Sequence, residues 1–312
     1  MGRVSCERII EIFGTDASRL LQTMTPRNIS NIPYGRCFYT PVVDETGGML
    51  NDPVGIRLAR DRYWLSLADS DLLYWVNGLA YGLGLNVHVF EPDISPLAVQ
   101  GPKAEELVSR VFGDSVRDIR FFHFREFSFL DKNLIVSRSG YSRQGGFEIY
   151  VDGSEAAEPL WDKLFELRND LLVRAGGPNQ IERIEAGLLS YGNDMSSLNN
   201  PYECGFDRFC HVETVDCIGR DSLLLIVEEG PIRKIRSFAI DGGPVSPCVE
   251  NWPIIVNGEK VGDITSAIWS PNFKTNVALG MILASHWDDG TQVEVNIFGD
   301  LRRATVKVNS FI

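Results

Sequence analysis

Residues 138–150 read Arg-Ser-Gly-Tyr-Ser-Arg-Gln-Gly-Gly-Phe-Glu-Ile-Tyr, and this stretch decides how we expect the chain to fold. A β-type segment, 133–137, precedes it, and its second half alternates with the period of two that is typical of a strand. Gly145 and Gly146 predict a tight reversal between the two halves. The stretch is therefore interpreted as a β-hairpin.

The two faces of the hairpin's second strand differ in chemistry. Glu148 and Tyr150 lie on one face, while the residues that alternate with them are apolar and would face a core. Tyr141 would approach the acid from the partner strand. An acid flanked by aromatic rings suits a flat heterocycle with an amide-like donor edge. The alternative is an edge hairpin whose glutamate and tyrosines are solvated, and this stretch alone leaves both interpretations open.

The composition indicates a globular protein with more than one core. The chain has 312 residues, 44% of them hydrophobic, and a formal net charge of −12 with its basic residues scattered singly. This charge argues against nucleic acid or an anionic membrane as a partner. No apolar run reaches the length of a membrane span, and the first residues do not resemble a signal or targeting segment. We therefore expect a soluble, cytoplasmic protein.

The cysteines and histidines form no recognisable metal or nucleophile motif. There is no C-x-x-C pair and no histidine at zinc-finger spacing, and no Ser-His-Asp or Cys-His unit can be assembled. We predict reduced thiols in packed positions and no metal site. The cysteines are Cys6, Cys37, Cys204, Cys210, Cys217 and Cys248.

Helices and strands alternate along most of the chain, which predicts an α+β protein. Glu182 and Glu185 with Arg183 beside them suggest the solvated face of a helix. From residue 232 short β segments follow one another without a helical period, which predicts a small barrel or sandwich. We expect α+β domains over 1–92 and 93–229 and a β-domain over 230–312. Helices are predicted to start at Thr15 or Asp16, to follow Asp69-Ser70-Asp71 as far as Leu83, and to cover 101–112, 156–172, 180–191 and 219–227.

A series of short motifs spread over nearly the whole chain resembles the folate-dependent aminomethyltransferases, the family of the glycine cleavage T-protein. Within that family, further stretches resemble the branch that demethylates dimethylsulfoniopropionate. The family motifs are 47–52, 97–103, 138–150, 183–187, 191–195, 218–220 and 264–271. The stretches that resemble the demethylating branch are 35–39, 51–54, 68–71, 181–185, 189–194 and 200–207.

This resemblance implies a three-domain cloverleaf whose third domain is a small β-barrel, with tetrahydrofolate in a central channel. The family's pterin-clamping glutamate falls at Glu148, with Tyr141 and Tyr150 beside it. Tyr39 and Ser66 match positions that line the folate site in the demethylating branch. The implied partners are folate and a small sulfonium substrate. A homodimer is left open.

The implied catalytic positions are Asn51 and Asp52. T-proteins have an acidic pair here, whereas this chain has an amide at the first position, as in the demethylating branch. Expelling a nitrogen requires a proton donor, whereas a sulfonium loses its methyl group as a neutral thioether, so positioning would suffice. Asn51 could hold the folate, and Tyr39 could cradle the sulfonium by cation–π attraction. The alternative for 51–53 is an Asx-turn at a bulge.

We therefore expect a tetrahydrofolate-dependent methyltransferase that demethylates dimethylsulfoniopropionate. One alternative is another enzyme of the family, acting on an aminomethylated lipoyl carrier or on an N-methyl or O-methyl donor. A second is a folate-binding protein without turnover. This one stays open because relatives are expected to carry a further N-terminal segment that contributes to the substrate pocket, and because Arg3 replaces an expected aspartate.

Overall fold

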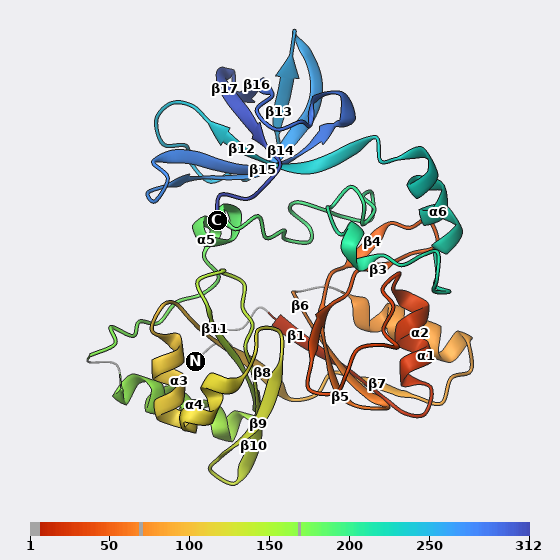
Figure 1. Cartoon of the computed structure of the whole chain (residues 1–312), viewed down its shortest axis with the longest axis vertical. Helices are drawn as coiled ribbons and strands as arrows, with labels where there is room; N and C mark the ends of the chain where they lie inside the picture. Colours follow the sequence, from red (N-terminus) through yellow and green to blue (C-terminus); the bar gives the residue numbers. More distant parts are fainter. Residues whose placement is uncertain (1–6, 69–70, 168–169) are drawn as a thin grey trace. The chain divides into compact units, whose positions relative to one another are not determined.

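A computed structural model describes residues 7–68, 71–167 and 170–312, which form two compact units (Figure 1). Unit 1 consists of the chain up to Val42 together with Asn51–Gly177, and unit 2 of Val43–Leu50 together with Pro178–Ile312. The two units are described separately. The domain boundaries expected at residues 92 and 229 stay a prediction.

The first half of unit 1 is a five-stranded antiparallel sheet in the order β2-β5-β6-β1-β7. Two helices accompany it, and the first is the predicted one: Asp16 precedes it, and Leu20, Leu21 and Met24 are buried. The second begins at Leu72, directly after Asp71, as predicted; Asp69 and Ser70 lie outside the described residues. The elements are β1 (Glu7–Phe13), α1 (Ala17–Met24), β2 (Cys37–Tyr39), β5 (Val54–Ala59), β6 (Arg62–Ala68), α2 (Leu72–Gly82) and β7 (His88–Phe90).

The second half of unit 1 is a four-stranded sheet in the order β8-β11-β10-β9. The second strand of the predicted hairpin, β11, lies between two neighbours, so the alternative of a solvated edge hairpin is wrong. Phe147, Ile149 and Val151 point away from Glu148 and pack against helices α3 and α4, as the strand period predicted. The elements are β8 (Ile94–Gln100), α3 (Ala104–Phe112), a 3₁₀ turn (Asp114–Asp118), β9 (Phe124–Phe129), β10 (Lys132–Ser137), β11 (Gly146–Asp152) and α4 (Ser154–Glu166).

Helix α4 is shorter than predicted. It ends at Glu166 rather than at Leu172. Leu172 is exposed and has a positive φ of 58°, which a helix cannot accommodate. The apolar residues beyond Glu166 thus continued the helical pattern in the sequence without continuing the helix.

The two sheets of unit 1 face each other. Ile9, Cys37 and Trp64 of the first sheet pack in one buried cluster with Ile135 and Tyr150 of the second. The layers are therefore helices, sheet, sheet and helices. This arrangement places the face that carries Glu148 and Tyr150 inside the unit, between the sheets.

Unit 2 contains a closed six-stranded barrel in the order β12-β15-β14-β13-β16-β17, with β17 pairing back onto β12. The barrel interpretation is confirmed over the sandwich, and all six strands lie in the stretch from residue 232 that was predicted to consist of short β segments. The strands are β12 (Arg233–Ile240), β13 (Trp252–Val256), β14 (Glu259–Ser270), β15 (Thr275–Leu283), β16 (Gln292–Ile297) and β17 (Asp300–Lys307).

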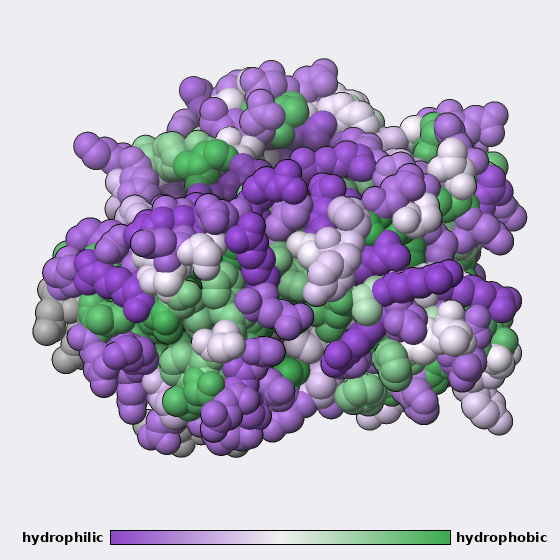
Figure 2. Space-filling view, turned by 60° about the horizontal axis from the view of Figure 1, so that its bottom comes forward, coloured by the Kyte–Doolittle hydropathy of each residue, from purple (hydrophilic) through white to green (hydrophobic). Residues whose placement is uncertain are grey.

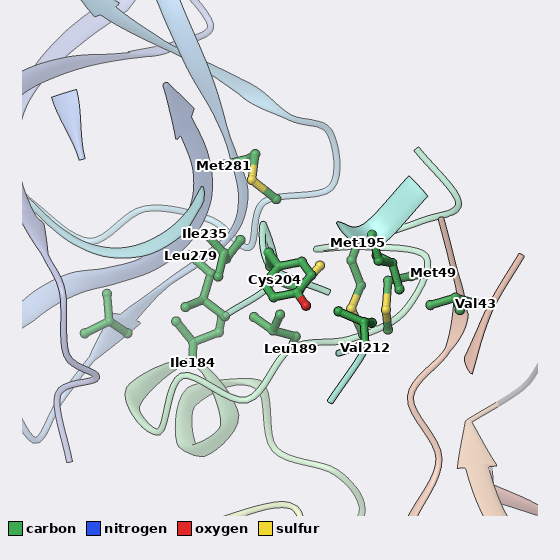
Figure 3. Close-up of a cluster of buried hydrophobic side chains, with 13 residues drawn as sticks. Val43, Met49, Ile184, Leu189, Met195, Cys204, Val212, Ile235, Leu279 and Met281 are labelled. Carbon is green, nitrogen blue, oxygen red and sulfur yellow. The ribbon is translucent and has the colours of Figure 1, made fainter. Parts of the chain in front are cut away.

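A second core in unit 2 joins distant parts of the sequence (Figure 3). Val43 and Met49 pack in it with Ile184, Leu223 and the barrel residue Leu279. The remaining elements are β3 (Val42–Val43), β4 (Met49–Asn51), α5 (Gln180–Glu185), α6 (Arg220–Glu229) and 3₁₀ turns at Asp207–Phe209 and Ala284–His286.

Helix α5 was predicted to reach Tyr191 but ends at Glu185. Gly187 has a φ of 67°, the left-handed conformation that closes a helix. No helix within the described ranges is both long and apolar enough to cross a membrane. In the view of Figure 2 hydrophilic residues cover much of the surface, with apolar residues between them.

Candidate functional site

The candidate site of unit 1 is built around Glu148, whose side chain is buried with only 7% of the residue exposed. Its neighbour across the sheet is Ser137 of β10. Ser139 donates a hydrogen bond to Glu148 Oε2, and the hydroxyl oxygens of Ser137 and Ser139 are 2.5 Å apart. The end of β10 thus supplies hydroxyl groups on the side where the carboxyl lies.

The facing sheet contributes a second acid. Ser66 of β6 donates from Oγ to Glu7 Oε2 of β1 at 3.0 Å, and Ser66 pairs in register with Ile9. Ile9 belongs to the same buried cluster as Tyr150, two residues beyond Glu148. The indole ring of Trp64 lies 5.8 Å from the Tyr150 ring, between centroids. Glu7, Ser66, Glu148 and Tyr150 therefore meet in the layer between the sheets.

The electrostatics of this cluster favour neutral side chains. Burial, together with the negative charge of Glu7, raises the pKa of Glu148 to about 8. Burial also raises the pKa of Glu7 above its ordinary value. The pKa of Tyr150 and that of the Cys37 thiol are raised by burial and by the nearby Glu148. Among the described residues no basic side chain forms an ion pair with Glu148.

Glu11 lies on the same face of β1 as Glu7 and has a basic partner. Arg62 Nε donates to Glu11 Oε1 at 2.7 Å, and the Trp64 indole nitrogen donates to Oε2 at 2.8 Å. Only 4% of Glu11 is exposed, so it is as deeply buried as Glu148. Burial alone therefore does not distinguish the Glu148 site; what distinguishes it is that no basic side chain of the described ranges pairs with Glu148.

Tyr39, Asn51 and Asp52 form a second group in unit 1. The Tyr39 hydroxyl donates to Asp52 Oδ2. Asn51 is buried, its Oδ1 accepts from the backbone nitrogen of Asp52 at 2.9 Å, and its Nδ2 has no hydrogen-bond partner in the described part of the chain. An Asx-turn that starts at Asn51 would need a backbone N–H at Pro53, which proline lacks, whereas an Asx-turn that starts at Asp52 stays an alternative.

The two groups are linked through the first sheet. Tyr39 pairs in register with Val54, which pairs with Ser66. Side chains of residues paired across a sheet lie on the same face, so Tyr39 and Ser66 both face the second sheet. Of the predicted folate-site residues, the structure thus gathers Glu148, Tyr150 and Ser66 and places Tyr39 along the same face.

Tyr141 was expected on the partner strand, and this was wrong. It lies half-buried in the connection after β10, which is eight residues long in the sequence (138–145) rather than a tight turn. Gly140 and Gly145 have positive φ values in this connection. Ser139 belongs to this connection and donates its hydrogen bond to Glu148 from there.

Sequence reasoning missed Glu7, Ser139 and Cys37. The alternation of Glu7, Ile9 and Glu11 was a usable signal, since it places two acids on one face of a strand.

Unit 2 holds the other buried polar cluster, and it overturns the prediction of a solvated face on α5. Arg183 Nη1 donates to Asp194 Oδ2 at 2.8 Å and Nη2 to Ser266 Oγ at 2.7 Å. Thr265 and Ser266 hydroxyls each donate to Asp194 Oδ1 at 2.6 Å. Asp194 is thus fully satisfied.

Glu185 of the same helix is buried as well. It accepts hydrogen bonds from the Ser270 hydroxyl and the Asn272 amide. These partners come from the end of β14 and the turn after it, so Glu185, an acid that was predicted to be solvated, joins the helix to the barrel. In the described ranges no three or more histidine, cysteine, aspartate or glutamate side chains converge in a way that could hold a metal ion.

The chain belongs to the aminomethyltransferase family that includes the glycine cleavage T-protein. The GCVT N-terminal domain matches residues 2–214, and the glycine cleavage T-protein C-terminal barrel domain matches residues 233–312. A crystal structure of the glycine cleavage system aminomethyltransferase T from Bartonella henselae has the same fold, with a TM-score of 0.89 and 24% identity over 99% of this chain and 85% of that one.

Within this family the chain is similar to a particular enzyme. It is 52% identical to the dimethylsulfoniopropionate demethylase DmdA of Ruegeria pomeroyi, over 97% of this chain and 83% of the demethylase. For comparison, it is 30% identical to the aminomethyltransferase of Thermoanaerobacter pseudethanolicus, over 97% of this chain and 83% of that enzyme.

The family is tetrahydrofolate-dependent, and tetrahydrofolate is the cofactor of this chain. The residues of unit 1 fit such a group. Glu148 is a buried acceptor without a basic partner, and the phenol oxygen of Tyr150 is buried without a hydrogen-bond partner among the described residues. A pterin presents amide and amine donors on a flat ring, which matches an acceptor beside an aromatic side chain.

Proposed function

We propose that this protein transfers a methyl group from the sulfonium of dimethylsulfoniopropionate to N5 of tetrahydrofolate. In this reaction the carbon–sulfur bond breaks and its electron pair stays on sulfur, giving a neutral thioether. A carbon–nitrogen bond forms at N5, and the N5 proton leaves to solvent. The products are 5-methyltetrahydrofolate and a methylthio acid.

The observation that carries this proposal is the amide at position 51. Asn51 is buried, and its Nδ2 lacks a hydrogen-bond partner among the described residues. An unpaired buried donor is costly, so it is best explained by an acceptor that arrives with a ligand. An amide cannot protonate a leaving nitrogen, whereas loss of a neutral thioether needs no proton. The 52% identity to a demethylase supports the same assignment.

Each predicted site residue then has a role in binding or orientation. Glu148 would accept hydrogen bonds from the pterin edge, with Tyr150 and Ser66 completing the lining and Tyr141 closing it from the connection after β10. Asn51 would orient the folate toward the methyl donor. Asp52, held by the Tyr39 hydroxyl, would bring a negative charge near a cationic substrate, and the Tyr39 ring would offer cation–π attraction. Rate enhancement would come from alignment of the two reactants.

A turnover assay tests the proposal directly. The protein is incubated with dimethylsulfoniopropionate and tetrahydrofolate, and 5-methyltetrahydrofolate is measured by mass spectrometry. Product that depends on both reactants is expected. Binding of tetrahydrofolate without turnover would instead support the folate-binding alternative.

Two variants assign the roles. Glu148→Gln removes the charged acceptor and is expected to weaken tetrahydrofolate binding by at least about tenfold, the value of one charge-assisted hydrogen bond. Unchanged affinity would refute the clamp. Asn51→Asp is expected to leave demethylation equal or lower; a large gain of glycine-cleavage activity would identify the chain as an aminomethyltransferase acting on a carrier-bound substrate. The cytoplasmic location and the homodimer stay predictions.

A further inference from the structure

Gln100 has no role in the proposed methyl transfer, although it lies in one of the family motifs, 97–103. It is the last residue of β8, where it pairs in register with Gly146, while Ala98 of the same strand pairs with Glu148. Residues two apart on a strand share a face, and so do residues paired across a sheet. Gln100 is therefore a half-buried residue on the face of the second sheet that carries Glu148.

The amide of Gln100 makes three hydrogen bonds around the connection 138–145. Its Nε2 donates to the Ser139 carbonyl at 3.0 Å and to the Phe147 carbonyl at 3.2 Å, and its Oε1 accepts from the Ser142 hydroxyl at 2.8 Å. Both carbonyls can only accept, which fixes the orientation of the amide. One side chain thus holds the beginning and the middle of the connection and the strand that follows it.

Two glycines let the chain approach this amide closely. A Cβ at Gly140 would collide with the Gln100 amide, and one at Gly146 would collide with the Gln100 backbone and amide. Glycine has no Cβ and leaves that space to the glutamine side chain. The connection thus packs directly against Gln100.

Two of the three contacts lie next to the acid of the candidate site. Ser139, whose carbonyl is held by Gln100, donates from its hydroxyl to Glu148 Oε2. Phe147, the other carbonyl partner, directly precedes Glu148 in β11. A hydroxyl has one hydrogen to donate, and the backbone decides where that hydroxyl lies. Loss of the Gln100 amide would therefore release the residue that orients the Glu148 carboxyl.

We propose that Gln100 is a positioning residue of the folate site, which holds the connection 138–145 in the conformation in which Ser139 orients Glu148 for the pterin edge. This inference rests on the proposed function. Gln100 acts through Ser139 rather than on either reactant. Its role extends to Tyr141, because that predicted folate-site residue lies in the same connection, between the two serines that Gln100 holds.

Gln100→Met is the test variant, because methionine has about the size of glutamine but carries no amide. Asn276→Leu is its matched control in the barrel of unit 2. The Asn276 amide is fully buried and makes the same set of bonds: Nδ2 donates to the Ile240 and Gly243 carbonyls, both at 3.1 Å, and Oδ1 accepts from the Val245 nitrogen at 3.0 Å. Both substitutions should lower the free energy of unfolding.

Tetrahydrofolate affinity, measured by titration calorimetry on folded protein, separates positioning from stability. Gln100→Met is expected to bind about fivefold more weakly than wild type, a smaller loss than for Glu148→Gln, because the acid remains but is less well oriented. Ser142→Ala removes only one of the three bonds and should weaken binding about twofold, which keeps the test open if Gln100→Met does not fold. Asn276→Leu should bind as wild type does. Loss of stability in Gln100→Met and Ser142→Ala with wild-type affinity would mean a merely structural role and would overturn the inference.

A double-mutant cycle tests the route through Ser139. In a Ser139→Ala background, Gln100→Met should weaken binding little further, because the hydroxyl that Gln100 positions is already absent. Additive effects of the two substitutions would show that Gln100 does not act through Ser139, which would overturn the inference.

Hydrogen exchange of the ligand-free protein separates this inference from the proposed function. Peptides that cover 138–147 should exchange at least about threefold faster in Gln100→Met than in wild type, whereas Asn276→Leu should speed up exchange only in the barrel. Unchanged exchange of 138–147 in Gln100→Met would overturn the inference whatever the folate result. Faster exchange there, together with a wild-type protein that binds no tetrahydrofolate, would overturn the proposed function but not the role of Gln100 toward Ser139.

Discussion

Glu148 in unit 1 and Asp194 in unit 2 are both buried carboxyl groups, but their surroundings are opposite. Asp194 receives hydrogen bonds from Arg183, Thr265 and Ser266, which neutralise its charge and satisfy its oxygens. Glu148 receives one from Ser139 and has no ion-pair partner among the described residues. A buried carboxylate with hydrogen-bond and ion-pair partners is compatible with a stable fold. A buried carboxylate without them lowers the stability of the fold and can bind a ligand that supplies the missing partners.

The largest effect is expected where the paired acid loses its partner. Arg183→Leu leaves the Asp194 carboxylate buried without its counter-ion, which should cost about 3–5 kcal/mol of unfolding free energy. Denaturant unfolding measures it. Lys163→Ala, in an exposed pair with Glu166, is the control and should cost less than about 1 kcal/mol. Equal costs for the two variants would mean that burial does not matter for the Arg183–Asp194 pair.

The same chemical change at the two acids should shift stability in opposite directions. The pKa of Glu148 in the folded protein, about 8, lies above its ordinary value of 4.5, so folding favours the protonated form and stability falls as pH rises from about 4.5 through 8. Glu148→Gln cannot ionise, and at pH 9 it should be more stable than wild type by about 2 kcal/mol or more.

Asp194→Asn, by contrast, should destabilise the protein by about 2 kcal/mol at the same pH, because Arg183 keeps its charge next to a neutral amide. Thermal unfolding of both variants at about pH 6 and pH 9 checks the pair. The contrast between the two acids fails if both substitutions shift stability in the same direction at pH 9.

The smallest effect is expected for an acid with a neutral partner. Tyr39→Phe removes the hydroxyl that donates to Asp52 and should cost about 0.5–1.5 kcal/mol of unfolding free energy. If Asp52 faces the cationic substrate, KM for that substrate should change severalfold while the unfolding change stays small. Tyr34→Phe, at an exposed ring, controls for loss of a phenol. Identical results for the two would remove Tyr39 from the site.

The sequence predicted best where local rules decide. The strand period set the two faces of β11, and the helix around Leu20 and the strands of the barrel were found from periodicity and turn residues. It predicted worst where a distant partner decides. Arg183 and Glu185 look solvated because their partners, such as Ser266, follow more than 80 residues later.

In the candidate site, too, local features could be predicted and features that depend on distant residues could not. Glu148 and Tyr150 could be placed together because they are two residues apart on one strand. The resemblance to the family added Ser66 and Tyr39. Glu7 could not be found, because its place in the layer that holds Glu148 depends on how the two sheets stack, and a sequence pattern carries no information on that stacking.

The core that joins Val43 and Met49 to Leu279 has a consequence for the order in which the protein is made. A ribosome delivers Met49 long before the barrel strand that contributes Leu279 to the same core, so this core stays incomplete until synthesis is nearly finished. A fragment that begins at residue 178 would lack both early side chains and leave their place in the core unfilled. Unit 2 is thus assembled from one short early segment, Val43–Leu50, and the last part of the chain to be synthesised.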